Sequence, residues 1–357
     1  MLSGLWLTPL LALLSLGHER AEDGGALDVY VVITAGFWIG HRLSSSLLAW
    51  GTAAYRPVLR TQRTRLVWIP VAIVAVVFSI VMPDDEHLPW TRAERTLALA
   101  SVDATLIIWH FAAQHFGVLS LYRLRAHRVG PSLRRADRVM ALGVGGVVVL
   151  LAELLAGTTF LQQHGLLDHM ETTIMAWGPV LRWAGRGTVV VVTVVVVVID
   201  RRHGWSWPRC LALLNVAVMA LVALAAQPFV FLVVWTAQHW LAAVGLSTMV
   251  AVDDNHEQRP WFVIRRPWRL PLLVTLSVLL FPVMEIEAVG EAERLSALLP
   301  GVTALMGSLV ATLSSSSLAP LLVALGFASA FVHYHLDRAV FRLSDPAVRR
   351  AVGSSLT

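Results

Sequence analysis

Long apolar runs recur along the whole of this 357-residue chain and constrain its fold more than any other feature. Charged residues lie mostly between the runs, which cover 28–53, 66–82, 97–122, 139–160, 176–200, 210–225, 229–251, 270–284 and 318–341. Lipid requires each crossing segment to pair its backbone polar groups internally, which favours helices. Since about 20 apolar residues span a bilayer, the runs predict an all-α fold in one membrane domain covering 1–357, a polytopic transmembrane helical bundle of about nine to eleven helices.

The composition supports a membrane location and argues against a nucleic-acid partner. The chain is 57% hydrophobic and 14% charged, whereas soluble domains average about 25% charged residues. Its net charge of +5 comes from arginines that flank the apolar runs, where they set topology and meet anionic lipid. The single cysteine, Cys210, excludes an internal disulfide and a cysteine-based zinc site. We expect an integral protein of a bacterial inner membrane, with the lipid bilayer as a partner and no nucleic acid.

Two terminal segments leave alternatives open. Residues 2–17 are apolar but short, and no positive residue precedes them, so we interpret them as a retained first helix rather than a cleaved signal peptide. Near the other end, two full crossings by 297–313 and 318–341 would put the final arginines outside, against the charge rule. A re-entrant 297–313 would instead place the C-terminus in the cytoplasm, which is the arrangement that we expect.

Histidine recurs inside the runs that we interpret as membrane-spanning. Imidazole is costly there unless it has a partner or a function. Counted back from the cytoplasmic ends at about 1.5 Å per residue, these histidines lie at similar depths on four different helices. The alternative for any single histidine is a hydrogen bond to a neighbouring helix. Together they predict one intramembrane metal site, whose candidate ligands are His41, His110, His115, His239, His333, His335 and Asp337.

Helical spacing and donor chemistry refine this site. His333 and Asp337 are four residues apart and share a face, whereas His115 lies about 140° from His110 around its helix. That pair can serve one centre only if the helix is distorted or the centre is broad, as a dinuclear site is. Imidazole suits iron, copper and zinc, and carboxylate adds a preference for iron or manganese. We therefore expect one or two iron ions, with copper or zinc as alternatives. Four polar residues would orient ligands or relay protons: Asp103, Gln114, Glu153 and Gln238.

Histidines gathered toward the cytoplasmic side of a polytopic bundle resemble the histidine-rich integral-membrane non-haem iron oxygenases, namely the alkane hydroxylases and fatty-acid desaturases. They resemble the carotene-cleaving membrane dioxygenases more distantly. The spacings differ: this chain has HxxxxH at His110 and His115 and HxH at His333 and His335, where the hydroxylases and desaturases have HxxxH and HxxHH boxes. The resemblance implies an intramembrane metal, an apolar substrate and oxygen chemistry, and it assigns no role to a single residue.

These observations predict a membrane-embedded, metal-dependent oxidoreductase that acts on a lipid or isoprenoid, namely an oxygenase, hydroxylase or desaturase. An electron-donor protein would be a further partner. Two other classes stay open. A proton- or ion-coupled transporter would use intramembrane groups such as Asp103 and Glu153, and a haem protein would use two facing histidines as axial ligands.

Overall fold

The computed structural model describes residues 41–87, 89–126, 128, 130–152, 154–155, 171–204, 206–225, 228–253 and 317–352. Throughout these ranges the chain forms helices joined by short turns, and no strand occurs in them. The all-α prediction is therefore confirmed for the described part of the chain, and the total number of crossings stays a prediction. Some predicted features lie outside the described residues: the first helix at 2–17, the segments 270–284 and 297–313, and Glu153.

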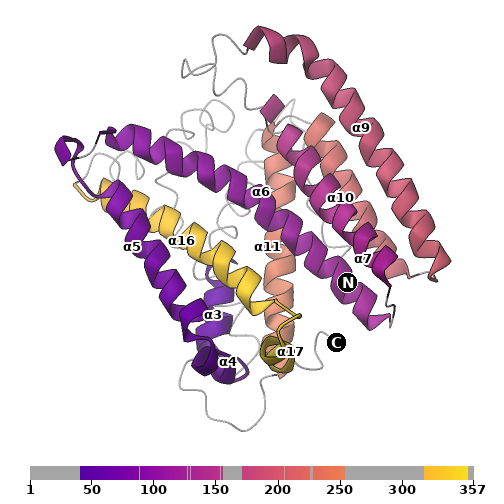
Figure 1. The fold of residues 1–357 in the computed structure, drawn as a ribbon, viewed down its shortest axis with the longest axis horizontal. Coiled ribbons are helices and arrows are strands. Elements are labelled where there is room, and N and C mark those ends of the chain that lie inside the picture. The colour runs from indigo at the N-terminus through magenta and orange to yellow at the C-terminus, as the bar shows by residue number, and fades with distance from the viewer. Residues whose placement is uncertain are drawn as a thin grey trace, which may run out of the picture. The chain divides into compact units, whose positions relative to one another are not determined.

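The helices are labelled in Figure 1. Their bounds are α3 Ser44–Gly51, α4 Arg56–Thr61, the π-helix η2 Thr64–Trp68, α5 Ile69–Val81, the 3₁₀-helix η3 Asp85–His87, α6 Arg92–Arg125, α7 Pro131–Arg138, the π-helix η4 Val139–Val148, α9 Glu171–Arg202, α10 Trp207–Ala225, α11 Pro228–Asp253, α16 Ala319–Val340 and α17 Pro346–Val352. They form two compact units that divide within α6 and within α11. We call Ile107–Trp235 the central unit, and the described residues of 41–106 and 236–352 the flanking unit.

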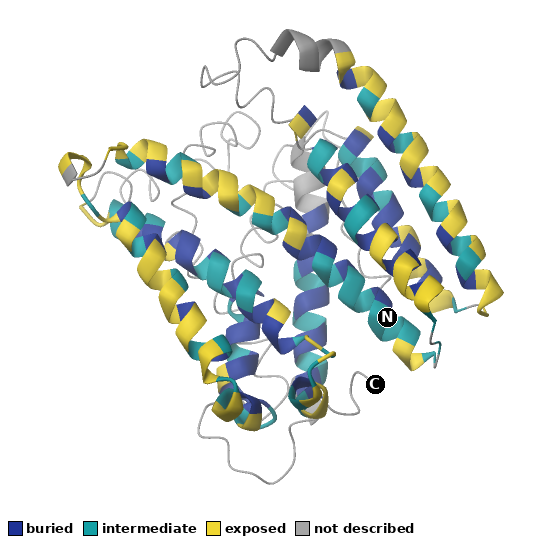
Figure 2. Ribbon diagram, in the orientation of Figure 1, coloured by how far each residue is buried: buried dark blue, intermediate teal, exposed yellow. Residues whose placement is uncertain are grey.

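Five helices within the described ranges are long and apolar enough to cross a membrane. They are Thr64–Val81, Arg92–Arg125, Trp177–Arg202, Trp207–Ala225 and Ala319–Val340. Large apolar side chains stay exposed on them, as Figure 2 shows along α5 and α9. Because water disfavours such extended apolar surfaces, these helices indicate a membrane protein.

The core of the flanking unit lies where α16 packs along α5. Figure 1 shows these two helices side by side. Buried apolar residues of α5, α6 and α16 fill this contact: Val77, Val81, Leu99, Ala324, Phe327 and Ala328. Helix α3 packs on α16 as well, which brings the segment after His41 next to the part of α16 that carries His333.

A capping box starts α6. The backbone N–H of Glu94 donates to Thr91 Oγ1 (3.3 Å), and the N–H of Thr91 donates to a carboxylate oxygen of Glu94 (2.8 Å). This exchange satisfies N–H groups that the first helical turn leaves without intrahelical partners. Arg95 is 4% exposed and donates to the carbonyl oxygens of Ile80 (2.8 Å) and Pro83 (2.6 Å). It therefore ties the end of α5 to the start of α6.

Glycine lets the helices of the central unit approach closely. Helices α9, α10 and η4 pack on one another. A Cβ added at Gly185 of α9 would lie 3.1 Å from the Leu224 side chain of α10, and one at Gly145 of η4 would lie 3.1 Å from Val216. A Cβ at either position would require the facing side chain of α10 to shift by a few tenths of an ångström, as expected for small residues at contacts between membrane helices.

A buried charge network fixes one end of the central unit. Arg209 of α10 is fully buried and donates to Asp137 of α7 and Asp200 of α9, at 2.5 Å each. Its third bond goes to the carbonyl oxygen of Leu119 in α6 (3.1 Å). The arginine-rich stretch between the runs 97–122 and 139–160 thus contains a helix, α7, because Asp137 and its apolar neighbours form a buried face.

Candidate metal centre

Three imidazoles from three separate helical segments meet in the flanking unit. His41 lies in the helical turn before α3, His239 in α11 and His333 in α16. Each offers one ring nitrogen, and these three nitrogens lie within 4.8 Å of one another. The three residues are 2%, 1% and 1% exposed. The fold thus assembles a buried nitrogen-donor group, which we call the three-imidazole group, from distant parts of the sequence.

The rings of this group pack edge to face around His41. Its ring centroid lies 4.7 Å from that of His239 and 4.7 Å from that of His333, with interplanar angles of 87° and 84°. Tetrahedral coordination with metal–nitrogen bonds of about 2.0–2.1 Å would place the ligand nitrogens about 3.4 Å apart. From separations of at most 4.8 Å, each pair would close by no more than about 1.4 Å to reach that geometry. Small side-chain rotations supply such a change, so these residues fit a bound ion.

Ser45 orients His333. Its Oγ lies 3.1 Å from Nδ1 of His333, and both side chains are buried. When Nδ1–H donates to Oγ, Nε2 carries the lone pair that a metal ion needs. Ligating histidines commonly donate their second nitrogen in this way. Ser45 is absent from the predicted site, although its four-residue spacing from His41 was the signal that could have identified it.

Two of the three imidazoles have polar neighbours in the chain, and one of these neighbours is charged. Arg42 follows His41 and is 3% exposed, and Tyr334 follows His333. The Arg42 guanidinium and the Tyr334 hydroxyl both interact with the carboxylate of Asp103 in α6. Asp103, predicted to orient a ligand or relay a proton, therefore has its partners beside the candidate centre.

Two predicted ligands of α16 have other contacts. His335 donates through Nε2–H to the carbonyl oxygen of Arg65 (2.7 Å), so this nitrogen is engaged by the backbone. Asp337 is 6% exposed and lies one turn after His333. Burial, and then the charge of Asp337, raise the pKa of Tyr55. The three-imidazole group includes neither His335 nor Asp337.

The remaining predicted residues lie outside the three-imidazole group as well. His110 and His115 belong to the central unit and are each 5% exposed. The His115 ring packs on η4, 3.6 Å from where a Cβ of Gly145 would lie. Gln114 is half-buried, and Gln238, beside His239 in α11, is 7% exposed. The structure thus locates these residues but does not test their predicted roles.

Three nitrogen ligands would leave coordination positions open on a bound ion. Structural zinc sites are usually closed by four protein ligands, whereas catalytic sites keep a position for water or substrate. The donor set suits iron, copper and zinc. Among the residues that the structure describes, the group offers three ligands, the number that catalytic zinc sites use. Compared with protein-family models, curated proteins and solved structures, the chain matches none.

Proposed function

We propose that this chain is a membrane-embedded, metal-dependent oxidoreductase acting on a lipid or isoprenoid substrate, as an oxygenase, hydroxylase or desaturase. The observation that carries the proposal is the group of His41, His239 and His333, whose ligand nitrogens lie within 4.8 Å of one another. A shared ion gives all three buried rings one common role. His333 lies in Ala319–Val340, a helix long and apolar enough to cross a membrane, which supports a location within the bilayer.

Iron is our first choice of ion, with copper and zinc as alternatives. His41, His239 and His333 would hold it, and Ser45 would keep Nε2 of His333 available as the ligand atom. Iron or copper would supply the electron-transfer chemistry by which dioxygen attacks an unactivated hydrocarbon. A second ion would need further ligands, for which the candidates in the flanking unit are His335 and Asp337.

Burial favours a substrate that enters from the bilayer. The three ligands are at most 2% exposed, so water has little access and reactive species are protected from side reactions. Hydroxylation or desaturation also consumes electrons, and an electron-donor protein is therefore a proposed partner. The exposed Arg349 and Arg350 of α17 support a cytoplasmic C-terminus in a bacterial inner membrane.

Elemental analysis of the purified full-length protein tests the proposal. Wild-type protein is expected to retain about one equivalent of transition metal, and His41→Ala and His239→Ala are expected to lose most of it. His203→Ala is the matched control, because His203 is exposed after α9 and contacts Ser132 instead. Metal-free wild-type protein, or equal loss in the control, would contradict a centre at the three-imidazole group.

Activity assays separate the remaining function classes. Oxygen consumption with membrane lipid and a reductant, lost in His239→Ala, is the result expected for an oxidoreductase. Proton-coupled flux in liposomes by metal-free protein would favour the transporter class. A Soret band would identify a haem protein.

A further inference from the structure

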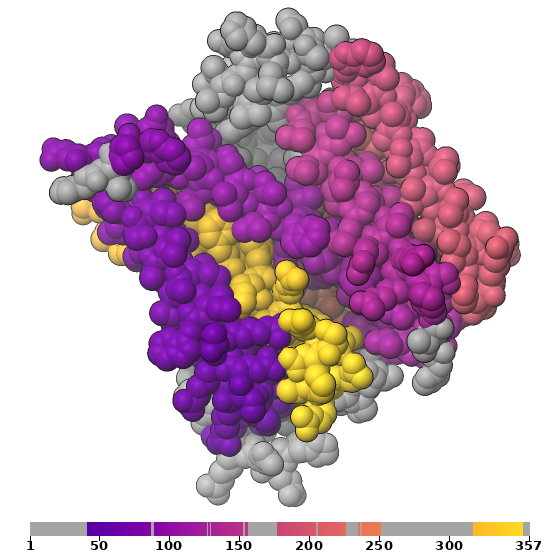
Figure 3. Space-filling view, viewed as in Figure 1, coloured from indigo at the N-terminus to yellow at the C-terminus, as the bar shows by residue number. Residues whose placement is uncertain are grey.

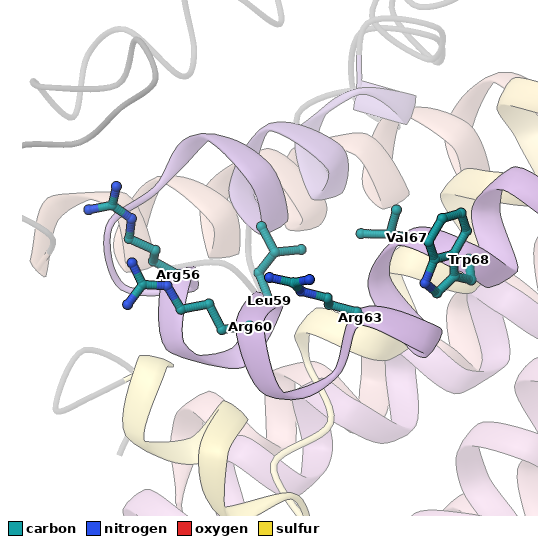
Figure 4. A pocket seen from close by; sticks show the side chains of 6 residues that line it. All are labelled: Arg56, Leu59, Arg60, Arg63, Val67 and Trp68. Atoms are coloured by element: carbon teal, nitrogen blue, oxygen red, sulfur yellow. The ribbon is translucent and has the colours of Figure 1, made fainter.

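A basic pocket opens in the flanking unit where α4 meets the apolar segment Thr64–Val81. Its volume of about 410 Å³ is typical of ligand pockets. Figure 4 shows its arginines toward one end and Val67 and Trp68 at the other. The lining consists of Arg56, Leu59, Arg60, Arg63, Val67 and Trp68. None of the proposed metal ligands belongs to it.

The pocket brings three arginines together. Arg56 and Arg60 are four residues apart in α4 and are neighbours on its surface. Arg63 follows the end of α4 at Thr61 and lines the same pocket. None of them pairs with a carboxylate among the residues that the structure describes. Arg65, by contrast, lies 3.6 Å from Asp345. Within the described chain, the positive charge at the pocket is therefore not neutralised.

The surroundings add to this positive charge. Helix α17 packs against α4, as the yellow and indigo surfaces of Figure 3 show, and it exposes Arg349 and Arg350. Asp345, just before α17, already accepts hydrogen bonds from the Gln62 side chain (2.7 Å) and the backbone N–H of Ala347 (2.9 Å). The summed field attracts an anion toward this surface.

An apolar path leads from the pocket along α5. Trp68 is 62% exposed, Val71 52% and Val74 38%, and residues three apart adjoin on a helix surface. Tryptophan is typical of the interface between membrane and water. A ligand with an anionic head and an apolar tail matches both ends of the pocket.

We propose that this pocket binds the phosphate headgroup of an anionic phospholipid, with an acyl chain lying along Trp68 and Val71. Guanidinium groups form strong, often bidentate hydrogen bonds with phosphate oxygens. Free phosphate shares the headgroup chemistry but has nothing to place on the apolar side. The bound lipid anchors the start of α5 at a leaflet rich in anionic lipid, and this role is independent of the proposed metal centre.

Fluorescence quenching by brominated lipid tests the proposal. The full-length protein is placed in phosphatidylcholine bilayers that contain increasing amounts of brominated phosphatidylglycerol. The part of the quenching that comes from Trp68 is the difference between wild type and Trp68→Phe. This Trp68 quenching is expected to reach its maximum at a low content of brominated phosphatidylglycerol. The same quenching by brominated phosphatidylcholine is expected to require a far higher content of that lipid.

Removal of the arginines measures their contribution. Each arginine side chain is expected to raise the affinity of the pocket for anionic lipid about fivefold. The triple variant R56Q/R60Q/R63Q is therefore expected to lose on the order of 100-fold of the preference. The matched control R134Q/R135Q/R138Q removes three exposed arginines of α7 and is expected to retain it. Arg63→Gln alone, with about a fivefold loss, keeps the test valid if the triple variant does not fold.

Several results would overturn the proposal. One is equal quenching of Trp68 by the two brominated lipids, and another is an unchanged preference in the triple variant. Equal loss in the α7 control would assign the effect to overall charge rather than to this pocket. Complete displacement of the lipid by inorganic phosphate would identify free phosphate as the ligand.

Discussion

Replacing Ser45 by alanine tests the candidate metal centre without removing a ligand. The change deletes the oxygen that lies 3.1 Å from Nδ1 of His333. Nδ1–H then loses the acceptor that would keep the lone pair on Nε2. Loss of such an outer partner typically weakens metal binding about 10–100-fold. A single bond of ordinary length between neutral groups contributes about 1 kcal/mol. Because about 1 kcal/mol corresponds to about fivefold, we expect a loss near the lower end of that range, about 5–10-fold.

Ser44 supplies the matched control. Ser44 and Ser45 are adjacent in α3 and are both 0% exposed. The Ser44 Oγ has no hydrogen-bond partner among the described residues. Ser44→Ala removes the same atom type from the same helix and is expected to leave metal affinity unchanged. Ser45→Thr keeps a hydroxyl and is expected to retain most of the affinity.

Competition with a chelator of known affinity measures these differences in metal-depleted full-length protein. Thermal unfolding of the metal-free variants separates a loss of protein stability from a loss of affinity. Equal metal affinity for Ser45→Ala and Ser44→Ala would refute the role of Ser45 in orienting His333. A tenfold loss in Ser44→Ala would refute it as well.

Two further predictions concern charged groups outside this centre. Asp137→Ala removes one partner of the fully buried Arg209 and is expected to lower the free energy of unfolding by about 3–5 kcal/mol. The control Asp84→Ala removes a carboxylate that is 79% exposed and is expected to lower it by about 0–1 kcal/mol. Equal shifts in thermal unfolding for the two variants would contradict this prediction. Burial alone would raise the pKa of Asp345, but hydrogen bonds from Gln62 and backbone N–H groups hold that pKa below its ordinary value. The stabilisation by Asp345 is thus fully present above the ordinary pKa and is lost as the pH falls through the lowered folded-state pKa. Thermal unfolding below about pH 4 should show this loss, and an identical profile for Asp345→Asn would contradict it.

The length of the apolar runs was sufficient to place most of the described helices. The runs 97–122 and 318–341 correspond to α6 Arg92–Arg125 and α16 Ala319–Val340. Helix α6 begins before its apolar run because Thr91 and Glu94 cap it. Hydropathy alone does not report such a cap, although the T-x-x-E pattern does.

The composition of the candidate site was less predictable. Counting residues gives the depth of a histidine but not the rotation of its helix or the identity of the facing helix. His115 was predicted to lie at a depth similar to that of the other histidines, and yet its ring packs on η4 in the central unit. His41, His239 and His333 meet because α3 packs on α16 and α11 adds its own side chain. Those contacts depend on side-chain packing between segments far apart in sequence.

A count of charges alone does not predict the arginine pocket. Counted only as charges, Arg56, Arg60 and Arg63 indicate which end of a helix faces the cytoplasm. The four-residue spacing of Arg56 and Arg60 additionally predicts that they share a helical face. The break after α4, which places Arg63 in the same pocket, and the apolar end formed by Val67 and Trp68 required the structure.

X-ray absorption at the edge of the metal retained by the purified protein tests the proposed centre most directly. We expect three imidazole nitrogens at about 2.0–2.2 Å from the absorbing ion, and one fewer in His239→Ala. An ion without imidazole neighbours at that distance, or an identical spectrum in His239→Ala, would contradict a metal centre built by His41, His239 and His333.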